Sequence, residues 1–525
     1  MIPTVSPAEV RLALLLRREV ALIDLREEDP FAKAHPLFAA CLPLSRLEVE
    51  VLDRIPRRDT PIVLYDDGEG LVAPAADRLR RLGYGCLRAL EGGLGGWRKA
   101  GFELFQDVNS YSKAFGELVD SRRATPSVAA EDLQALIDAR ADLVVLDARR
   151  FDEFQTMSIP TGVSVPGAEL VLRAPELAPD PKTTIVVNCA GRTRSIIGAQ
   201  SLINAGLPNP VAALRNGAIG WTLAGQALDH GQSRRFPDEP PRSAHEARAR
   251  ARTVAERAGV RRLTPSDLEA IAKAGDHRTL YRFDVRTPEE YAAGHIRGFR
   301  SAPGGQLVQE TDVFAPVRGG RIVLADDIGP RADMTASWLA QMGWDAFVLE
   351  GGFDGELETR PWRPTLPPLP AAEVIVPADL AEALAREAVT LVDLAPSPRH
   401  RKGHIPGAWF AIRARLDEAL AVVPQGRSIV LTSPDGVLAR LAVAEVEALS
   451  DRPAQVLAGG TEAWVAAGFE LERGLTSAAS PPDDVYRRPY EGADHAATAK
   501  QAYLDWEFGL VEQLARDGTH GFFVI

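Results

Sequence analysis

The residues of this chain that could carry out chemistry are concentrated around Cys189. Residues 186–195 read Val-Val-Asn-Cys-Ala-Gly-Arg-Thr-Arg-Ser, so an apolar strand ends at a cysteine and a loop rich in arginine leads into a helical stretch. The thiolate is the nucleophilic form of cysteine, and an unperturbed thiol with a pKa of about 8.5 is only slightly ionised near neutral pH. We therefore expect the surroundings of Cys189 to stabilise its thiolate.

The residues after Cys189 have properties that would provide this stabilisation. A helix N-terminus offers unsatisfied amides and a partial positive charge, and Arg192 and Arg194 would add charge if they turn inward. Gly191 permits backbone conformations that strain other residues, so consecutive amides could line a shallow cup. We predict that Cys189 is the catalytic residue, that Arg194 is the stronger of the two arginine candidates, and that substrate is bound by Ala190, Gly191, Arg192, Thr193, Arg194 and Ser195.

The other two cysteines, Cys41 and Cys86, lie in apolar contexts and are interpreted as small buried hydrophobic residues. Three scattered cysteines are too few for a disulfide framework, and none belongs to a CxxC or Cys/His cluster that would indicate zinc. We expect no metal and no cofactor. A reducing compartment, the cytoplasm, fits this use of cysteine.

The segment around Cys189 belongs to a pattern that occurs four times. In each copy an apolar run ends in an aspartate, and a second apolar run begins 36 or 38 residues later; the aspartates are Asp24, Asp147, Asp284 and Asp393, and the second runs begin at Ile62, Ile185, Ile322 and Ile429. A stretch with apolar residues at helical spacing follows, and then a third run ends in a glycine turn. Strands alternating with helices predict parallel sheets joined by right-handed crossovers.

These copies predict an α/β chain of four tandem domains, each a small parallel β-sheet flanked by helices on both faces. The predicted domains are 1–102, 125–225, 260–358 and 373–472, and a tail with a helix occupies 473–525. Tyr503, Trp506 and Leu510 lie on one side of that helix. We favour packing of this side on a domain over a dimer contact.

Two copies contain a Gly-His-Ile-x-Gly turn, at residues 294–298 and 403–407. With the preceding aspartate and the strand, loop and helix that follow, this turn resembles the rhodanese homology domain over most of the chain. Copy two departs from the pattern, with Met-Ser-Ile-Pro-Thr-Gly at residues 157–162. We interpret the histidines as turn residues, so the departure weakens the family match more than the chemistry. Asp147 and Arg149 have equivalents in copies without the cysteine, which favours a turn residue and a structural salt bridge.

In the family that this chain resembles, the nucleophilic cysteine ends the second strand. Copies one, three and four have Asp66, Asp326 and Ser433 there, so Cys189 is the only candidate. The resemblance implies that Cys189 takes a sulfane sulfur from a donor such as thiosulfate or an organic persulfide and becomes a persulfide. Cys189 would then pass the sulfur to cyanide or to a thiol, which a protein could carry. The arginines would bind the anionic part of the donor.

Other enzyme classes and non-catalytic roles compete with sulfur transfer as the function of Cys189. A cysteine phosphatase or arsenate reductase would have its arginine six positions after the cysteine, where this chain has Ser195, so the loop is one residue too short to enclose a phosphate in that way. A scaffold that docks sulfur-carrying proteins, or a redox sensor at Cys189, stays open. A dinucleotide site is disfavoured because Gly93-x-Gly95-x-x-Arg98 lacks the third glycine.

The overall composition and charge disfavour some classes of binding partner. The chain has 525 residues, of which 46% are hydrophobic and 25% charged, as is typical of globular proteins. A net charge of −12 disfavours nucleic acid and anionic membranes, and the Arg-rich segment 243–262 also contains glutamates, as in a solvated helix. The N-terminus lacks a signal-peptide pattern, and no run of 18 apolar residues occurs. We expect small sulfur compounds as partners and a homodimer as a possibility.

Overall fold

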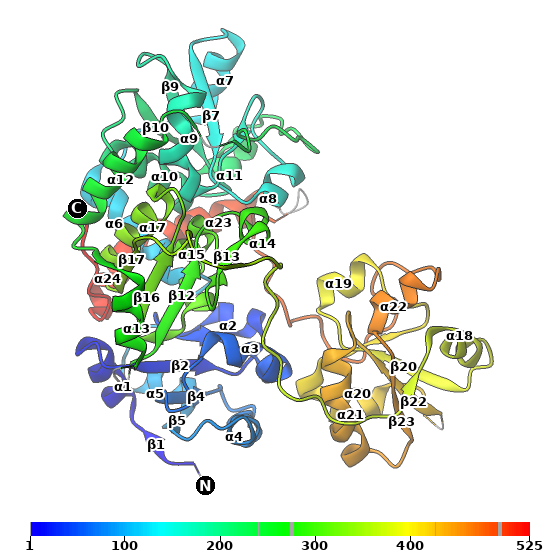
Figure 1. Cartoon of the computed structure of the whole chain (residues 1–525). Coiled ribbons are helices and arrows are strands. Elements are labelled where there is room, and N and C mark those ends of the chain that lie inside the picture. Colours follow the sequence, from blue (N-terminus) through cyan, green and yellow to red (C-terminus); the bar gives the residue numbers. More distant parts are fainter. Residues whose placement is uncertain (1, 240, 274–277, 426, 492–495) are drawn as a thin grey trace.

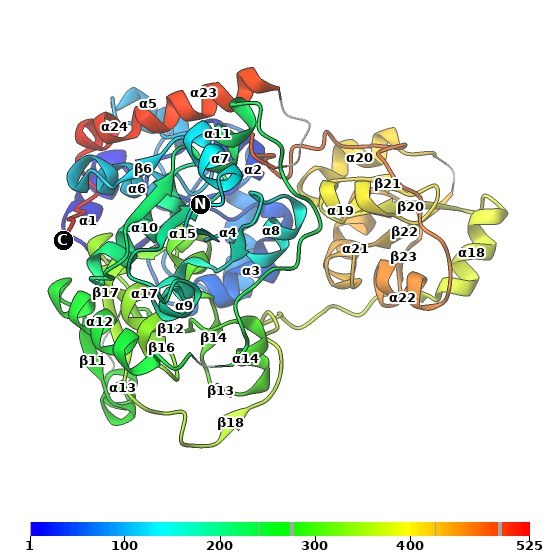
Figure 2. The same cartoon turned by 90° about the horizontal axis from the view of Figure 1, so that it is seen from above.

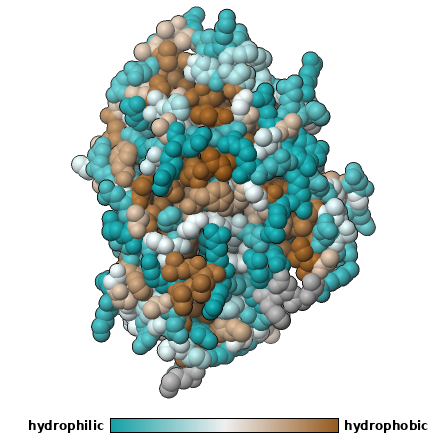
Figure 3. Space-filling view, turned by 90° about the vertical axis from the view of Figure 1, so that its left-hand side faces the viewer, coloured by the Kyte–Doolittle hydropathy of each residue, from teal (hydrophilic) through white to brown (hydrophobic). Residues whose placement is uncertain are grey.

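The computed structural model describes residues 2–239, 241–273, 278–425, 427–491 and 496–525. Four α/β units follow one another along the chain, and each has a parallel sheet with helices on both faces (Figure 1). The predicted fold class is confirmed. Within the described residues, no helix is both long and apolar enough to cross a membrane. On the face drawn in Figure 3, apolar side chains form separate patches with hydrophilic side chains between them.

The second unit contains Cys189, and its central strand is β9 (Thr184–Asn188). The strand order is β6-β10-β9-β7-β8, with all neighbours parallel. The side chains of Ile185 and Val187 enter one core cluster and that of Val186 enters another. A strand buried on both faces has a continuous apolar sequence, which is why the pattern located it. The other strands are β6 (Ser127–Val128), β7 (Leu143–Asp147), β8 (Val163–Ser164) and β10 (Val211–Leu214).

Helices cover both faces of this sheet. The cores on the two faces are built by α9 (Leu170–Leu177) with α10 (Thr193–Asn204), and by α7 (Ala130–Asp138) with α11 (Gly217–Leu223). The short helix α8 (Phe151–Thr156) follows β7. Because the strands are parallel, the loops after β7, β9 and β10 meet at one edge of the sheet, where Cys189 lies.

The other three units repeat the strand order of the second, apart from short additions. The first has strands β1 (Thr4–Val5), β2 (Val20–Asp24), β3 (Ala40–Cys41), β4 (Ile62–Tyr65) and β5 (Leu87–Leu90), with helices α1 (Pro7–Leu15), α2 (Glu28–Lys33), α3 (Leu47–Arg54), α4 (Val72–Arg81) and α5 (Gly93–Lys99).

The third unit has strands β11 (Arg261–Leu263), β12 (Leu280–Asp284), β14 (Arg300–Ser301), β16 (Arg321–Ala325) and β17 (Asp345–Leu349), with helices α13 (Pro265–Lys273), α14 (Pro288–Ala293), α15 (Gly304–Gln309), α16 (Thr311–Phe314) and α17 (Pro330–Gln341). A separate antiparallel pair joins β13 (His295–Ile296) to β18 (Leu357–Glu358). The strand β15 (Val317–Arg318) pairs antiparallel with β2 and so extends the sheet of the first unit.

The fourth unit has strands β19 (Val374–Ile375), β20 (Val389–Asp393), β21 (Trp409–Phe410), β22 (Ser428–Thr432) and β23 (Ala454–Leu457), with helices α18 (Pro377–Ala385), α19 (Ser397–Lys402), α20 (Leu416–Val422), α21 (Val437–Leu449) and α22 (Gly460–Ala466). It stands to one side in both cartoon views (Figure 2). Its Arg413 contacts the first unit through Glu48, at 2.9 and 3.0 Å.

Segments between the units form helices that pack on them. The buried helix α6 (Ser110–Arg123) contacts α10, and α12 (Ala244–Arg257) packs on α17 through its alanines and Val254 while its arginines face outward. The segment 243–262 is therefore solvated on one side only. The tail forms α23 (Ala497–Phe508) and α24 (Leu510–Asp517), which lie along α6, and α23 also contacts α11 (Figure 2).

Candidate active site

Cys189 lies directly after β9 and four residues before α10, in a loop that is almost closed to solvent. The residue is 2% exposed. Its thiol donates a hydrogen bond to Oγ of Ser195 at 3.5 Å, and the Ser195 hydroxyl donates to the carbonyl of Arg192 at 2.8 Å. The first turn of α10 is thereby tied to the sulfur and to the loop that precedes it.

The loop is held in place by the N-terminus of α11. The amides of Ala218 and Ile219 donate to the carbonyls of Cys189 and Ala190 at 2.9 and 3.0 Å. This approach requires a glycine at 217, because Gly217 has a φ of +55° and a Cβ there would lie 2.4 Å from the Cys189 carbonyl oxygen. The conformational freedom that the sequence suggested for Gly191 is therefore used by Gly217, in the glycine turn after the third strand of the repeated pattern.

Gly191 is needed for space instead. A Cβ at this position would lie 3.4 Å from Cε1 of Tyr503 and 3.5 Å from Oε2 of Glu507, two residues of α23. The tail helix thus covers the outer side of the loop. The other small loop residues are also buried: Ala190 is 2% exposed, and Thr193 packs its Cγ2 against Gly116 of α6.

The resting loop does not lower the pKa of Cys189, contrary to the expectation from the sequence. Burial raises the pKa of this thiol above its usual value. The charge of Arg194 and hydrogen bonds from Ser195 act in the opposite direction, but they do not outweigh burial, and Asp147 adds to the rise. The site therefore holds a protonated thiol near neutral pH with one guanidinium nearby.

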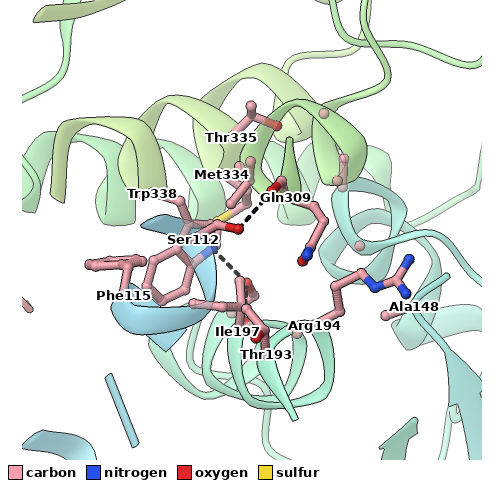
Figure 4. Close-up of a pocket in the computed structure, with 17 residues that line it drawn as sticks. Ser112, Phe115, Ala148, Thr193, Arg194, Ile197, Gln309, Met334, Thr335 and Trp338 are labelled. Carbon is pink, nitrogen blue, oxygen red and sulfur yellow. Dashed lines mark hydrogen bonds between the residues drawn. The ribbon is translucent and has the colours of Figure 1, made fainter. Parts of the chain in front are cut away.

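Arg194 is the arginine that belongs to the site. It extends from the first turn of α10 and forms a two-point ion pair with Glu153 of α8, at 2.8 and 2.9 Å. Burial would raise the pKa of Glu153, but Arg194 and its neighbours hold it at about 2, so the pair is ionised. Figure 4 shows Arg194 along the edge of a small cavity, with Gln309 of α15 opposite.

Arg192 is directed away from Cys189. Its guanidinium binds Glu117 of α6 at 2.7 and 2.9 Å and Asp120 at 2.9 Å, and it lies 4.3 Å from the centre of the Phe508 ring. These contacts join the loop to α6 and to the tail. The structure therefore separates the two arginines: Arg194, the stronger candidate from the sequence, lines the cavity, and Arg192 does not.

Asp147 and Arg149 form a buried ion pair beneath the loop. Nε and Nη2 of Arg149 donate to the Asp147 carboxylate at 2.9 and 2.7 Å, and Asn188 donates to the same carboxylate at 2.9 Å. The first and third units have equivalent pairs, Arg26 with Asp24 and Arg286 with Asp284. The structural ion pair expected for Arg149 is present, and Arg149 also lines the cavity in front of the loop.

A cavity of about 290 Å³ lies in front of the loop. Its wall includes Ala190, Arg194 and Glu153 from the second unit. Five more residues of the second unit also line it: Arg149, Arg150, Asp152, Thr156 and Met157. The remaining wall comes from other parts of the chain: Asn109 before α6, Gln309 and Glu310 of the third unit, and Arg488, Tyr490 and Glu491 of the tail. Sequence reasoning missed these residues, because nothing in copy two indicates which distant segment covers its loop.

The third unit has a charged version of the same loop. The carboxylate of Asp326, which takes the position of Cys189, accepts hydrogen bonds from the amides of Ile328, Gly329 and Arg331 at 3.2, 2.9 and 2.9 Å. The Arg331 guanidinium also donates to it, at 3.0 Å. Arg331 pairs with Glu290 of α14 at 2.7 Å, as Arg194 pairs with Glu153. In the other units, Asp66 accepts two loop amides and Ser433 accepts one.

Comparison with known proteins agrees with this architecture. The model of the rhodanese-like domain family matches residues 7–100, 129–224, 264–357 and 376–467. The chain therefore belongs to the rhodanese family, and the prediction of four rhodanese-like domains in tandem is confirmed.

Two similar proteins cover different shares of the chain. The crystal structure of a thiosulfate sulfurtransferase from Pseudomonas aeruginosa is 61% identical, with a TM-score of 0.97, and the likeness covers all of both chains. An uncharacterized protein from Synechocystis sp. is 33% identical over 107 residues. That match covers 20% of this chain and 58% of the Synechocystis protein.

Proposed function

We propose that this protein is a rhodanese-type sulfurtransferase that carries sulfane sulfur as a persulfide on Cys189. The enzyme class predicted from the sequence is confirmed by the four matched domains and by the full-length likeness to a thiosulfate sulfurtransferase. The donor that we propose is thiosulfate or an organic persulfide, and the acceptor is cyanide or a thiol, which a protein could carry. The unit at 125–225 would be catalytic, and those at 1–102, 260–358 and 373–472 would supply walls and interfaces.

The observation that carries the role of the loop is the carboxylate of Asp326. In the third unit a negative group at the nucleophile position is bound by four backbone amides and by the arginine five residues later. The fold of this loop therefore suits an anion at that position. Cys189 as a thiolate or persulfide would be such an anion, and Arg194 would bind it from the place of Arg331.

In the first step the Cys189 thiol loses its proton to solvent water, and its sulfur attacks the outer sulfur of thiosulfate. The bond between the two sulfur atoms of thiosulfate breaks, sulfite leaves with the electron pair, and Cys189 becomes a persulfide anion. In the second step an acceptor thiolate or cyanide attacks the outer sulfur of the persulfide, and the Cys189 thiolate leaves. Arg194 would stabilise the negative charge that stays at residue 189 in both steps.

The test is the intact mass of the protein after incubation with thiosulfate. We expect a gain of one sulfur that a reducing thiol removes, and no gain in Cys189→Ser. If neither thiosulfate nor an organic persulfide adds sulfur, the catalytic proposal is wrong. A docking scaffold or a redox sensor would then be the better account of Cys189.

The phosphatase alternative is disfavoured by a contact as well as by spacing. Ser195, which stands six positions after the cysteine, accepts the Cys189 thiol and ties it to the loop carbonyl of Arg192. In a phosphatase, the arginine that encloses the phosphate would occupy the position of Ser195. Phosphate ester hydrolysis is therefore expected to be undetectable beside sulfur transfer.

We propose a cytoplasmic location, because three free cysteines fit a reducing compartment. The apolar side of the tail is used within the chain, since Tyr503 and Leu504 are buried against Ile219 and Leu510 is buried as well. A homodimer would have to use another surface, and the mass in solution would detect it.

A further inference from the structure

We propose that the C-terminal tail supplies two donor-binding residues to the second domain, Arg488 and Tyr490, which select a sulfur oxyanion such as thiosulfate. This inference rests on the proposed function of Cys189 and adds a substrate class and the residues that recognise it. The catalytic pocket would then be complete only in the full chain. Its donor end would be built by residues that follow the fourth domain in the sequence.

The tail forms part of the cavity wall that faces the reactive loop. Ala190 and Arg194 belong to the same 290 Å³ cavity as Arg488, Tyr490 and Glu491. The cavity is larger than thiosulfate, which has five heavy atoms, so a donor bound by the loop alone would leave most of it empty. Groups on the tail side are therefore placed to bind the part of the donor that does not react.

Arg488 lines this wall and has one guanidinium nitrogen without a hydrogen-bond partner among the described residues. One edge of its guanidinium, through Nη1, binds Glu491. Its Nε is buried and has no hydrogen-bond partner among the described residues. A buried N–H without an acceptor is unfavourable, and a sulfonate oxygen would satisfy it.

Tyr490 lines the same cavity wall as Arg488 and Arg194. Burial raises the pKa of its phenol well above the usual value, and the charges of Arg488 and Arg194 both act on it in the opposite direction. The phenol is therefore neutral and keeps its proton as a donor. Its ring packs edge-on against Tyr503, with centroids 5.4 Å apart, and Lys113 of α6 lies 5.6 Å from its centre.

The two helices of the tail pack on the second domain and on the segment that follows the first domain. On α23, Tyr503 and Leu504 pack on Ile219 of α11. On α24, Gln513 donates to the carbonyl of Leu104 at 2.9 Å, and Arg516 pairs with Glu103 at 2.8 Å. The aromatic face of the tail also surrounds the buried ammonium of Lys113, which lies 5.0 Å from the Tyr503 ring.

All four arginines of the wall have a carboxylate partner, and Arg488 differs because its buried Nε has no hydrogen-bond partner among the described residues. Arg194 and Arg150 are paired with Glu153 and Asp152. Arg149 is paired with Asp147. With the sulfonate at Arg488 and Tyr490, the outer sulfur of thiosulfate would point to Cys189. Sulfite would then be released next to the same donors, which stabilise its charge.

The test is the affinity for thiosulfate in the Cys189→Ser background, where no sulfur is transferred and binding is measured alone by titration calorimetry. We expect Arg488→Gln to weaken binding roughly tenfold, which is about 1.4 kcal/mol. Arg487→Gln is the matched control, because Arg487 is the exposed neighbour in the same segment and lies outside the cavity wall. Its affinity should change by less than about twofold, a range typical of an exposed surface substitution.

Two further variants keep the test decisive if Arg488→Gln disturbs the tail. Arg488→Lys should recover part of the affinity, and Tyr490→Phe should lose affinity without removing a charge. Equal affinities of the Arg488→Gln and Arg487→Gln proteins would overturn the inference. So would failure of thiosulfate to bind Cys189→Ser at all, whereas sulfur loading of the wild-type protein by an organic persulfide would still support the proposed function.

Discussion

The second and third domains use one loop for two purposes. Between them every element of the loop keeps its spacing: Cys189 corresponds to Asp326, Arg194 to Arg331 and Glu153 to Glu290. In the third domain the carboxylate occupies the amide cup permanently, and Arg331 also reaches Glu169 of the second domain at 3.0 Å. A built-in anion thus makes the loop an interface, while a cysteine leaves the cup available for a reacting sulfur.

Ala190 adds to the difference between the two loops. Its counterpart Asp327 binds Arg286 at 3.2 Å and Arg331 at 2.8 Å, so a second carboxylate fills the space beside the guanidinium. In the second domain the methyl group of Ala190 leaves that space to the cavity. The comparison predicts that charge, more than shape, separates the structural loop from the reactive one.

The largest effect is expected from Arg331→Met. Arg331 is fully buried and compensates Asp326, Glu290 and Glu169, so its loss leaves buried carboxylates without a partner. We expect a loss of about 3–5 kcal/mol in the free energy of unfolding of the domains that it joins, measured by urea unfolding.

The same substitution in the second domain, Arg194→Met, is the control. Arg194 is 15% exposed and has one carboxylate partner, so its removal should cost much less stability. Similar losses in the free energy of unfolding at both positions would mean that the two arginines have the same structural role. The contrast between a structural and a reactive loop would then fail.

Arg194→Gln should have the next largest effect, and on activity. The charge of Arg194 lowers the pKa of the Cys189 thiol, so without it the pKa rises further and less thiolate is present at a given pH. We expect sulfur loading to slow by roughly a hundredfold near neutral pH, as on removal of one anion-binding donor. The rate measured against pH should also rise at a higher pH than in the wild type.

The pH profile separates this role from a structural one. Arg192→Gln removes a nearby charge that is directed to Glu117 and away from the thiol. The pH at which the rate of sulfur loading rises should be the same in Arg192→Gln as in the wild type, even if the substitution weakens the contact with α6. An equal shift in both variants would show that Arg194 acts on Cys189 only through the general charge of the loop.

The sequence is enough to predict the reactive loop, but not the distant segments that pack over it. Cys189 and the loop after it are local features, and four repeated copies reveal the sheets around them. The sequence also contains a signal for Glu153. The two copies with an arginine five residues after the nucleophile position also have a glutamate at the position of Glu153. The other two copies have neither residue: one has Leu71 with Pro30, and the other has Leu438 with Arg399. The ion pair could have been inferred from that co-occurrence.

The elevated pKa of Cys189 and the tail residues could not be inferred in this way. The outer side of the loop is covered by α23, whose Tyr503 and Glu507 lie against Gly191, and no local pattern links residues so far apart in the chain. The same holds for β15, which pairs across units with β2. Contacts between units are set by packing of surfaces that only the folded chain brings together.

The smallest effect, and the sharpest test of charge against shape, is expected from giving the second domain the carboxylate of the third. In Ala190→Asp the new group should reach Arg194 as Asp327 reaches Arg331, and it should compete with an anionic donor. Ala190→Asn introduces nearly the same volume without the charge. We expect the thiosulfate concentration for half-maximal sulfur loading to be roughly threefold to tenfold higher for the aspartate than for the asparagine, and the gap to narrow as salt screens the charge. Equal values for the two variants would show that the space at residue 190, and not the charge beside Arg194, distinguishes the reactive loop.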